Sequence, residues 1–385
     1  MKIGIEGQRL YREKKHGMDM VALELIRNLQ RLDHDNEYVI FVKPDVDRDA
    51  LQETDNFKIV ELQGGSYPMW EQRALPKAAE KEGCDILHCT SNTAPVKSNV
   101  PLVLTLHDII YLESLGIFKK SGTWYQKFGN LYRRFVVSRI VNKCEKIITV
   151  SKFERERIRR FFGFDDQDTR LVAIYNGVSE HFKHIADQQI IKKVREKYLL
   201  PQNFFLFLGN TDPKKNTPGV IAAYADYVKE ASAPIPLVMI DYSEESLRQI
   251  PAYTQSPELK DHIHLPGYVV NTDLPVLYSM ADVFLYPSLR ESFGIPMLEA
   301  MACGTPVITS KAASMPEVSG GAAKLVDPYQ PRQITNAMRE LLENDTMRKE
   351  LVDKGYRRAA EFTWEAMARD VLNLYHDVWN QINNR

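Results

Sequence analysis

Residues 286–308 read YPSLRESFGIPMLEAMACGTPVI. The apolar run before this stretch ends at Tyr286, a polar loop follows, and a helix is predicted to begin at 294–296, with Pro296 in its first turn. Another apolar run follows the helix. This order predicts a strand–loop–helix–strand unit of a parallel α/β sheet, and such sheets bind ligands beyond the carboxyl ends of their strands.

The residues at the start of this helix are suited to binding a ligand. Gly294 lets the backbone approach a ligand closely, and the free N–H groups of a helix start favour an anion. Two carboxylates, Glu291 and Glu299, flank the same place, and they would repel phosphate unless they face hydroxyl groups. The stretch therefore predicts a site for a ligand with both phosphate and hydroxyl groups; the alternative is an ordinary capped helix with solvent-facing acids.

The strand–helix alternation continues along the whole chain. Short apolar runs predict strands at 1–5, 38–42, 57–62, 86–88, 101–106, 146–150, 171–174, 203–208, 236–240, 262–265, 283–286, 306–309 and 323–325. Helical spacing predicts helices at 20–32, 70–81, 123–143, 190–198, 218–229, 274–280 and 296–302, with two long helices at the end. The prediction is two doubly wound α/β domains, 1–180 and 181–364, with the active site in the cleft between them.

Length and composition agree with two soluble globular domains. The chain has 385 residues, of which 44% are hydrophobic and 26% charged. Its four cysteines are scattered and form no C-x-x-C pair, which argues against a disulfide framework or a structural zinc site and favours the cytoplasm. No signal-like segment and no bilayer-length apolar run is present in the sequence, so we expect no transmembrane segment.

The formal net charge of −1 hides an uneven distribution. Residues 119–160 hold thirteen Lys and Arg against three Glu, which gives +10 locally and −11 for the rest of the chain. Aromatic residues interleave with these cations; they are Trp124, Tyr125, Phe128, Tyr132 and Phe135. Two interpretations stay open: docking on an anionic membrane surface, or aromatic core residues beneath a solvated basic face.

A second polar loop follows the predicted strand at 203–208. It begins at Gly209 and carries Lys214 and Lys215. Fixed cations at the end of a strand stabilise a ligand group that carries or gains negative charge, such as a phosphate, without a metal ion. In the first domain, His107 follows the strand at 101–106 and is a weaker candidate for a residue of the active site. His88, at the end of another strand, is interpreted as a structural histidine.

These motifs together resemble the retaining glycosyltransferases of the GT-B fold, specifically family 4. Residues 291–299 match that family's E-x-F-G-x-x-x-x-E signature at every defined position. The resemblance implies that Glu291 and the amides of Phe293, Gly294 and Ile295 hold the donor sugar, and that Glu299 holds the ribose. It also implies that the last helix, 365–385, crosses back to the first domain.

The resemblance assigns further residues to the donor. Lys215 matches the family's diphosphate lysine, whereas Asn210 stands where many members have arginine, so Lys214 is the candidate for the missing charge. The remaining implied contacts are His107 facing the donor sugar, Gly209 at the diphosphate loop, Tyr268 and Val269 at the base, and Gly17 at a phosphate.

Segments 70–72, 85–88 and 107–108, with Pro76, resemble a branch of the family that contains many mannosyltransferases. The implied function is transfer of a hexose, mannose favoured, from a nucleotide sugar to a saccharide or lipid-linked acceptor in polysaccharide or glycoconjugate biosynthesis, with retention. We expect no cofactor and no metal; the D-x-D sequence at Asp45 and Asp47 reads as a solvated loop. We expect a cytoplasmic protein, peripheral at the inner face of the plasma membrane. The base, GDP or UDP, stays open.

Other classes fit less well. A dehydrogenase would need G-x-G-x-x-G after the first strand, and the glycines there have the wrong spacing. No nucleic-acid-reading motif accompanies the basic stretch, so we expect no nucleic acid partner. The main alternative is a two-lobed sugar- or nucleotide-binding protein without catalysis.

Overall fold

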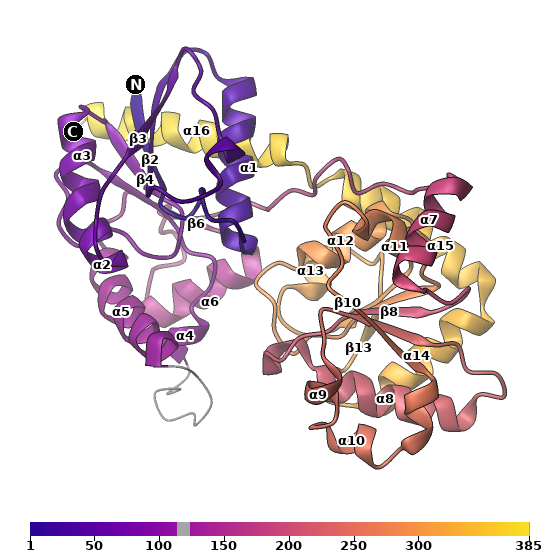
Figure 1. Cartoon of the computed structure of the whole chain (residues 1–385). Helices are drawn as coiled ribbons and strands as arrows, with labels where there is room; N and C mark the ends of the chain where they lie inside the picture. Colours follow the sequence, from indigo (N-terminus) through magenta and orange to yellow (C-terminus); the bar gives the residue numbers. More distant parts are fainter. Residues whose placement is uncertain (114–123, 385) are drawn as a thin grey trace. The chain divides into compact units, whose positions relative to one another are not determined.

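The computed structural model describes residues 1–113 and 124–384, and it divides into two compact units (Figure 1). The first unit is Met1–Gly177 with Trp364–Arg385, and the second is Val178–Thr363. Each unit is a parallel sheet with helices packed against it, so the predicted α/β class with two doubly wound domains is confirmed.

The first sheet has seven strands in the order β3-β2-β1-β4-β5-β6-β7, all parallel. The strands are β1 (Lys2–Gly7), β2 (Glu37–Val42), β3 (Phe57–Glu61), β4 (Ile86–Cys89), β5 (Leu102–Thr105), β6 (Lys146–Thr149) and β7 (Leu171–Ala173). The order reverses between β1 and β4, and at such a point the connecting loops diverge and leave room for a ligand.

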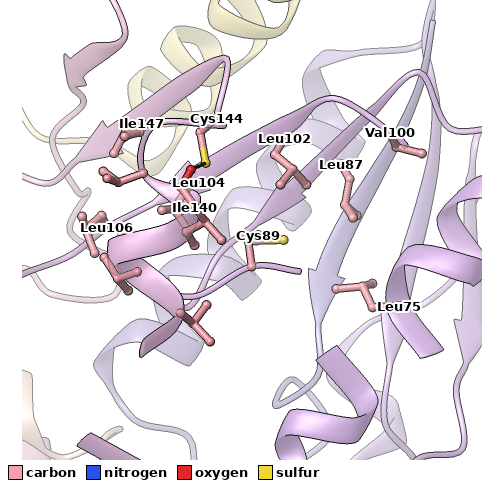
Figure 2. Packing of buried hydrophobic residues seen from close by; sticks show 14 of the residues in the cluster. Leu75, Leu87, Cys89, Val100, Leu102, Leu104, Leu106, Ile140, Cys144 and Ile147 are labelled. Carbon is pink, nitrogen blue, oxygen red and sulfur yellow. Dashed lines mark hydrogen bonds between the residues drawn. The ribbon is translucent and has the colours of Figure 1, made fainter. Parts of the chain in front are cut away.

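The helices of the first unit are α1 (Gly17–Leu32), α2 (Tyr67–Met69), α3 (Leu75–Lys81), α4 (Ile110–Glu113), α5 (Trp124–Ile140), α6 (Lys152–Phe162) and α16 (Trp364–Asn383), with short turns at Arg48–Ala50 and Trp70–Ala74. Figure 2 shows part of the core, where leucines of β4 and β5 pack with Ile140 of α5 and with Leu75 of α3. Every residue of β4 and β5 is buried, as expected for central strands of a sheet that helices cover on both faces.

The second sheet has six parallel strands in the order β10-β9-β8-β11-β12-β13. The strands are β8 (Phe205–Leu208), β9 (Leu237–Ile240), β10 (Ile263–Gly267), β11 (Val283–Tyr286), β12 (Val307–Ser310) and β13 (Lys324–Val326). The order reverses between β8 and β11, whose carboxyl ends carry the two polar loops singled out in the sequence.

The helices of the second unit are α7 (Gln188–Tyr198), α8 (Thr217–Glu230), α9 (Glu244–Leu247), α10 (Pro251–Thr254), α11 (Leu274–Met280), α12 (Ile295–Ala302), α13 (Met315–Ser319), α14 (Pro331–Glu343) and α15 (Asp345–Ala360), with 3₁₀ turns at Pro213–Lys215 and Pro257–Asp261. One hydrophobic cluster of this unit lies between the sheet and helices α8 and α14, and further buried side chains come from α11 and α12.

The prediction of two long helices at the end of the chain is wrong, because α14, α15 and α16 are three separate helices. Asn344 separates α14 from α15 with a non-helical backbone, and its side-chain oxygen accepts the N–H of Met347 at 2.9 Å. Helix α6 was also absent from the prediction, although Ser151 caps it and Gly163 ends it in the left-handed conformation.

The basic stretch falls mainly on α5 and α6. Lys119 and Lys120 lie outside the described residues, as do the side chains of Trp124, Tyr125 and Lys127. Phe128, Leu131 and Phe135 are 62%, 56% and 53% exposed, whereas Tyr132 is half-buried. The exposed three share one helical face (i, i+3, i+7), so the interpretation of all the aromatics as core residues does not hold for Phe128 and Phe135.

No helix in the residues that the structure describes is long and apolar enough to cross a lipid bilayer.

Candidate active site

A cavity of about 310 Å³ lies at the carboxyl edge of the second sheet. Residues from the ends of β8, β9 and β11 and from the start of α12 line it; they are Leu208, Gly209, Asn210, Thr211, Lys215, Asp241, Tyr286 and Pro296. The cavity thus lies at the point where the strand order reverses, the position at which open α/β sheets bind ligands.

Lys215 and Glu291 form an ion pair beside this cavity. The Lys215 Nζ lies 2.6 Å from Glu291 Oε1 and 3.3 Å from the Tyr286 hydroxyl, and it lies over the Tyr286 ring. Both charged side chains are largely buried, at 23% and 10% exposed. The structure therefore brings together two residues that are 76 positions apart in the chain and that separate motifs predicted to contact the donor.

Two buried polar residues hold the loops that carry this pair. Asn216 has a left-handed backbone (φ 62°), and its side-chain amide donates to the carbonyls of Pro287 and Pro328 at 3.0 and 2.7 Å. Ser314 donates to the carbonyl of Glu291 at 2.9 Å. These bonds fix the backbone on both sides of the cavity, so Lys215 and Glu291 sit on rigid supports.

Helix α12 begins at the cavity. Gly294 precedes it with φ 100°, and a Cβ there would lie 2.5 Å from the Met315 Cε. No side chain caps the helix, so its first N–H groups remain available for an anionic ligand. Phe293 is buried and its ring packs edge-on against Phe362, so the atoms it can offer a ligand are those of its backbone.

Glu299 lies one turn into α12 and is partly buried. Its Oε2 accepts a hydrogen bond from the Tyr278 hydroxyl at 3.3 Å. Burial raises the pKa of the Glu299 carboxyl to about 7, because desolvation disfavours the charged form. A ligand that donates hydrogen bonds to this carboxylate would stabilise its ionised form.

The glycine and asparagine after β8 shape the loop that carries Lys215. A Cβ at Gly209 would lie 2.5 Å from the Tyr242 Cβ, so glycine is required there. The Asn210 side-chain oxygen accepts the Asp212 N–H at 2.7 Å, and its carbonyl accepts the Thr217 hydroxyl at 2.6 Å. Asn210 therefore lines the cavity while stabilising the turn, a role that an arginine in its place would not fill in this way.

Lys214 differs from its neighbour. Its side chain is 38% exposed, lies 3.7 Å from Asp212, and does not line the cavity. The prediction that it supplies a second cation to the diphosphate gains no support from this geometry.

The turn after β10 contains Tyr268 and Val269. Tyr268 is 73% exposed and Val269 is buried, and neither lines the cavity directly. Asp241, at the end of β9, joins this turn to the cavity, since its N–H donates to the Gly267 carbonyl at 3.0 Å and its carboxylate accepts the Val269 N–H. Sequence reasoning missed Asp241, because nothing in its neighbourhood forms a known motif.

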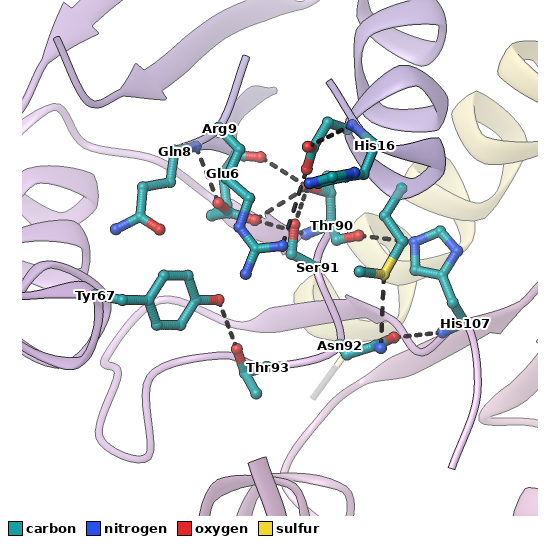
Figure 3. A network of polar contacts seen from close by, with 12 residues as sticks. Glu6, Gln8, Arg9, His16, Tyr67, Thr90, Ser91, Asn92, Thr93 and His107 are labelled. Carbon is teal, nitrogen blue, oxygen red and sulfur yellow. Dashed lines mark hydrogen bonds and ion pairs between the residues drawn. The ribbon is translucent and has the colours of Figure 1, made fainter. Parts of the chain in front are cut away.

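A buried polar network lies in the first unit, at the carboxyl ends of β1, β4 and β5 (Figure 3). His107 is 5% exposed; its N–H donates to the Asn92 side chain at 2.6 Å and its Nε2 donates to the Thr90 carbonyl at 3.0 Å. Burial lowers the pKa of His107, so its ring is neutral at physiological pH. Glu6 accepts from the backbone and hydroxyl of Thr90 at 3.3 and 3.0 Å.

Glu71 forms a second centre, whose side-chain contacts the sequence did not reveal. It is 1% exposed, and its carboxylate accepts hydrogen bonds from Tyr67, Gln72, Thr93 and Tyr132. Four donors compensate for the desolvation of a buried carboxylate. The centre joins the turn at Trp70–Ala74 to α5.

Gly17 is the first residue of α1 and is exposed, and a Cβ at that position would touch nothing within 4 Å. The His16 N–H donates to Asp19 at 3.0 Å, which closes the start of the helix. Glycine is thus not required here for steric reasons, and its contact with a phosphate stays a prediction.

The two carboxylates of the D-x-D sequence are not arranged as metal ligands. Asp47 forms an ion pair with Lys15, and Asp45 is exposed and accepts the Val46 N–H at 2.8 Å. Within residues 1–113 and 124–384, no group of three or more His, Cys, Asp or Glu side chains is placed to hold a metal ion.

Two family models match the chain. The model "Glycosyltransferase Family 4" matches residues 16–182, and "Glycosyl transferases group 1" matches residues 190–358.

Several bacterial mannosyltransferases are similar to this chain. The O-antigen chain mannosyltransferase RfbU of Salmonella typhimurium is 30% identical over 71% of this chain and 69% of its own length. The O-antigen chain mannosyltransferase B of Escherichia coli is 31% identical over 61% of each chain. The serotype-specific mannosyltransferase WbdA of Escherichia coli is 28% identical over 72% of this chain but only 34% of its own length. The chain thus matches less than two thirds of these two Escherichia coli proteins.

Solved structures share the fold. The sucrose-phosphate synthase of Thermosynechococcus elongatus has a TM-score of 0.74 at 22% identity and covers 99% of both chains. HepE of Anabaena, solved in complex with UDP, has a TM-score of 0.74 at 19% identity and covers 98% of this chain and 100% of its own. At these identities the likeness shows the fold, and it confirms the predicted GT-B architecture.

Proposed function

The chain belongs to the family 4 glycosyltransferases, and from that membership we propose that it transfers a hexose from a nucleotide diphosphate sugar to a saccharide or lipid-linked acceptor. We propose mannose as the hexose, because the similar bacterial proteins are named mannosyltransferases. The setting is the synthesis of an O-antigen-like polysaccharide, with retention of the anomeric configuration.

The observation that carries this proposal is the Lys215–Glu291 pair beside a cavity at which α12 begins. A leaving diphosphate gains negative charge as the sugar develops positive charge in an oxocarbenium-like state. Lys215 and the N–H groups of α12 place fixed positive charge beside the leaving diphosphate. The Glu291 carboxylate accepts hydrogen bonds from the sugar. Glu299 takes the ribose hydroxyls.

This arrangement needs no metal, since Lys215 and the helix start supply the charge that a divalent cation would otherwise provide. We propose that the enzyme uses no cofactor and that EDTA leaves its turnover unchanged. A turnover that falls in EDTA and returns with Mg²⁺ or Mn²⁺ would exclude this part of the proposal.

The test is a transfer and donor-hydrolysis assay across GDP- and UDP-sugars, with Glu291→Gln, Lys215→Met and the control Lys214→Met. The two lysines are adjacent, but only Lys215 lines the cavity. We expect losses of at least about 10²-fold for Glu291→Gln and Lys215→Met, the range seen for removal of one electrostatic group, and less than about threefold for Lys214→Met. Normal turnover by Lys215→Met in a folded protein would contradict the proposal.

We further propose that the first unit docks on an anionic membrane surface at the inner face of the plasma membrane, through α5. Its exposed face carries Phe128, Leu131 and Phe135, and Arg139 lies 3.5 Å over the Phe135 ring. Cations beside exposed apolar side chains suit a bilayer with acidic headgroups. On α6, by contrast, Arg157 and Arg160 pair with Glu113 and Glu156, so much of the positive charge there is already compensated.

Vesicle co-sedimentation tests the docking. The chain should bind vesicles that contain phosphatidylglycerol, bind less in high salt, and lose binding in the triple variant Phe128→Ser, Leu131→Ser, Phe135→Ser. Tyr329→Ser is the matched control, because Tyr329 is 71% exposed in the second unit. Binding that persists in the triple variant would exclude α5 as the docking surface.

A further inference from the structure

Asp241 combines three properties that are uncommon in one residue. It follows β9 directly, it lines the cavity, and its backbone is left-handed with φ 57°. Non-glycine residues rarely adopt this region, and Asp and Asn tolerate it best. Such strained positions concentrate where a side chain contacts a ligand.

The charge of Asp241 does not suit the anionic end of the donor. Lys215 and the start of α12 attract phosphate on the β8 and β11 side of the cavity, whereas a carboxylate on the β9 side repels it. Asp241 is exposed at the edge of the cavity, and partial desolvation still raises the pKa of its carboxyl. A ligand group beside this carboxylate is favoured if it donates hydrogen bonds.

The parts of a nucleotide sugar can be assigned by elimination. Resting on the proposed function, Glu291 serves the hexose, Glu299 the ribose, and Lys215 the diphosphate. The base is the remaining part with N–H groups. Asp241 directly follows β9, which is two strands away from β11, and it is hydrogen-bonded to the Gly267–Val269 turn at the same edge of the sheet.

We propose that Asp241 recognises the base and selects guanine over uracil. Guanine presents two adjacent donors, N1–H and the N2 amino group, which match the two oxygens of one carboxylate. Uracil presents one N–H between two carbonyl oxygens, and a carboxylate would repel both. The donor is therefore a GDP-sugar.

The test is isothermal titration of GDP and UDP into the full chain, wild type and Asp241→Asn. Asparagine tolerates the left-handed backbone and keeps an oxygen for the Val269 N–H, so the variant should fold. It replaces one carboxylate oxygen with a donor that clashes with a guanine N–H. Asp212→Asn is the control, because Asp212 is half exposed and does not line the cavity.

We expect wild type to bind GDP at least tenfold more tightly than UDP, and Asp241→Asn to lose about tenfold or more for GDP alone, since a hydrogen bond to a charged group contributes on this order. Equal or tighter binding of UDP by wild type, or equal losses for both nucleotides in Asp241→Asn, would overturn this inference and leave the transferase proposal intact. Failure of wild type to bind any nucleotide would overturn both.

Discussion

Gly294 illustrates how one residue determines the shape of the candidate site. Its φ is 100°, and a Cβ at this position would come within 2.5 Å of Met315, so there is no room for a side chain. We expect Gly294→Ala to lower the free energy of unfolding by about 1–3 kcal/mol and to weaken nucleotide binding, because the start of α12 must shift. Urea denaturation and titration with GDP measure the two effects.

Gly17→Ala is the matched control for that variant, because a Cβ there meets nothing within 4 Å and Gly17 is not in the left-handed region. Its free energy of unfolding should stay within about 0.5 kcal/mol of wild type. An equal loss in both variants would show that the effect is not specific to the site.

The raised pKa of Glu299 leads us to expect opposite pH dependences for the stability of the protein and for its binding of the nucleotide. Its pKa of about 7 lies above its unfolded value, so the folded state binds the extra proton between about pH 4.5 and 7, and stability falls as the pH rises through this range. Ribose binding needs the ionised form and should therefore strengthen over the same range. Glu299→Gln should gain about 1–3 kcal/mol in stability relative to wild type on going from pH 5 to pH 8.

Urea denaturation of wild type and Glu299→Gln at pH 5 and pH 8 measures the effect on stability, and titration with GDP at the same two pH values measures the effect on binding. A relative stability that does not change with pH would show that Glu299 is ionised throughout.

The site residues differ in how readily the sequence reveals them. Glu291, Gly294 and Glu299 fall within one contiguous motif, so their proximity is built into the spacing of a single loop and helix. Asp241 becomes significant only through strand order, which brings the loop after β9 to the cavity. The segment around Glu71 is recognisable in the sequence, but its contacts with Thr93 and Tyr132 depend on tertiary packing that no local pattern encodes.

At the scale of elements, α16 is attached to the first sheet by a buried hydrogen-bonded histidine. His88 on β4 contacts the Tyr375 hydroxyl at 2.6 Å through Nδ1 and the Thr105 hydroxyl at 2.8 Å through Nε2. We expect Tyr375→Phe to cost about 1–3 kcal/mol, since it leaves a buried ring nitrogen without its partner. Tyr329→Phe, at an exposed tyrosine, should change the free energy of unfolding by less than about 0.5 kcal/mol.

The same histidine makes the element sensitive to acid. Burial lowers the pKa of His88 to about 3, below its unfolded value near 6.5, so only the unfolded state binds the proton between these values. Stability is therefore lost as the pH falls below about 6.5, by about 2 kcal/mol at pH 5. The advantage of wild type over His88→Gln should shrink by that amount between pH 7 and pH 5; an unchanged difference would contradict this.

All thirteen predicted strands are present, because most of them are short apolar runs buried in a sheet that helices cover. The helix predicted at 70–81 is instead a π-helical turn at Trp70–Ala74 followed by α3. Pro76 explains the interruption, since it lacks the N–H that would bond to the carbonyl of Gln72. The division between α14 and α15 depends on one residue, Asn344, which periodicity alone does not resolve.

At the scale of the whole molecule, the first unit needs both ends of this chain. Val371, Tyr375 and Val378 of α16 are fully buried, and α16 packs against α1. We expect deletion of residues 364–385 to abolish cooperative unfolding of the first unit, because the lost burial of these side chains approaches the whole stability of a domain. Calorimetry should show the second unit, with its GDP-induced shift, unchanged. Loss of both transitions would show that the units unfold as one.

The second unit is inserted between two parts of the first, since the chain leaves the first unit after Gly177 and returns at Trp364. On the ribosome, residues 178–363 are therefore complete before α16 has been made. Domains generally fold as they emerge, at roughly 5–20 residues per second, with the amino-terminal one first. Here that order is inverted: the nascent seven-stranded sheet must wait for roughly 10–40 s with the α16 face of its core uncovered, and it is during this interval that a chaperone would be needed.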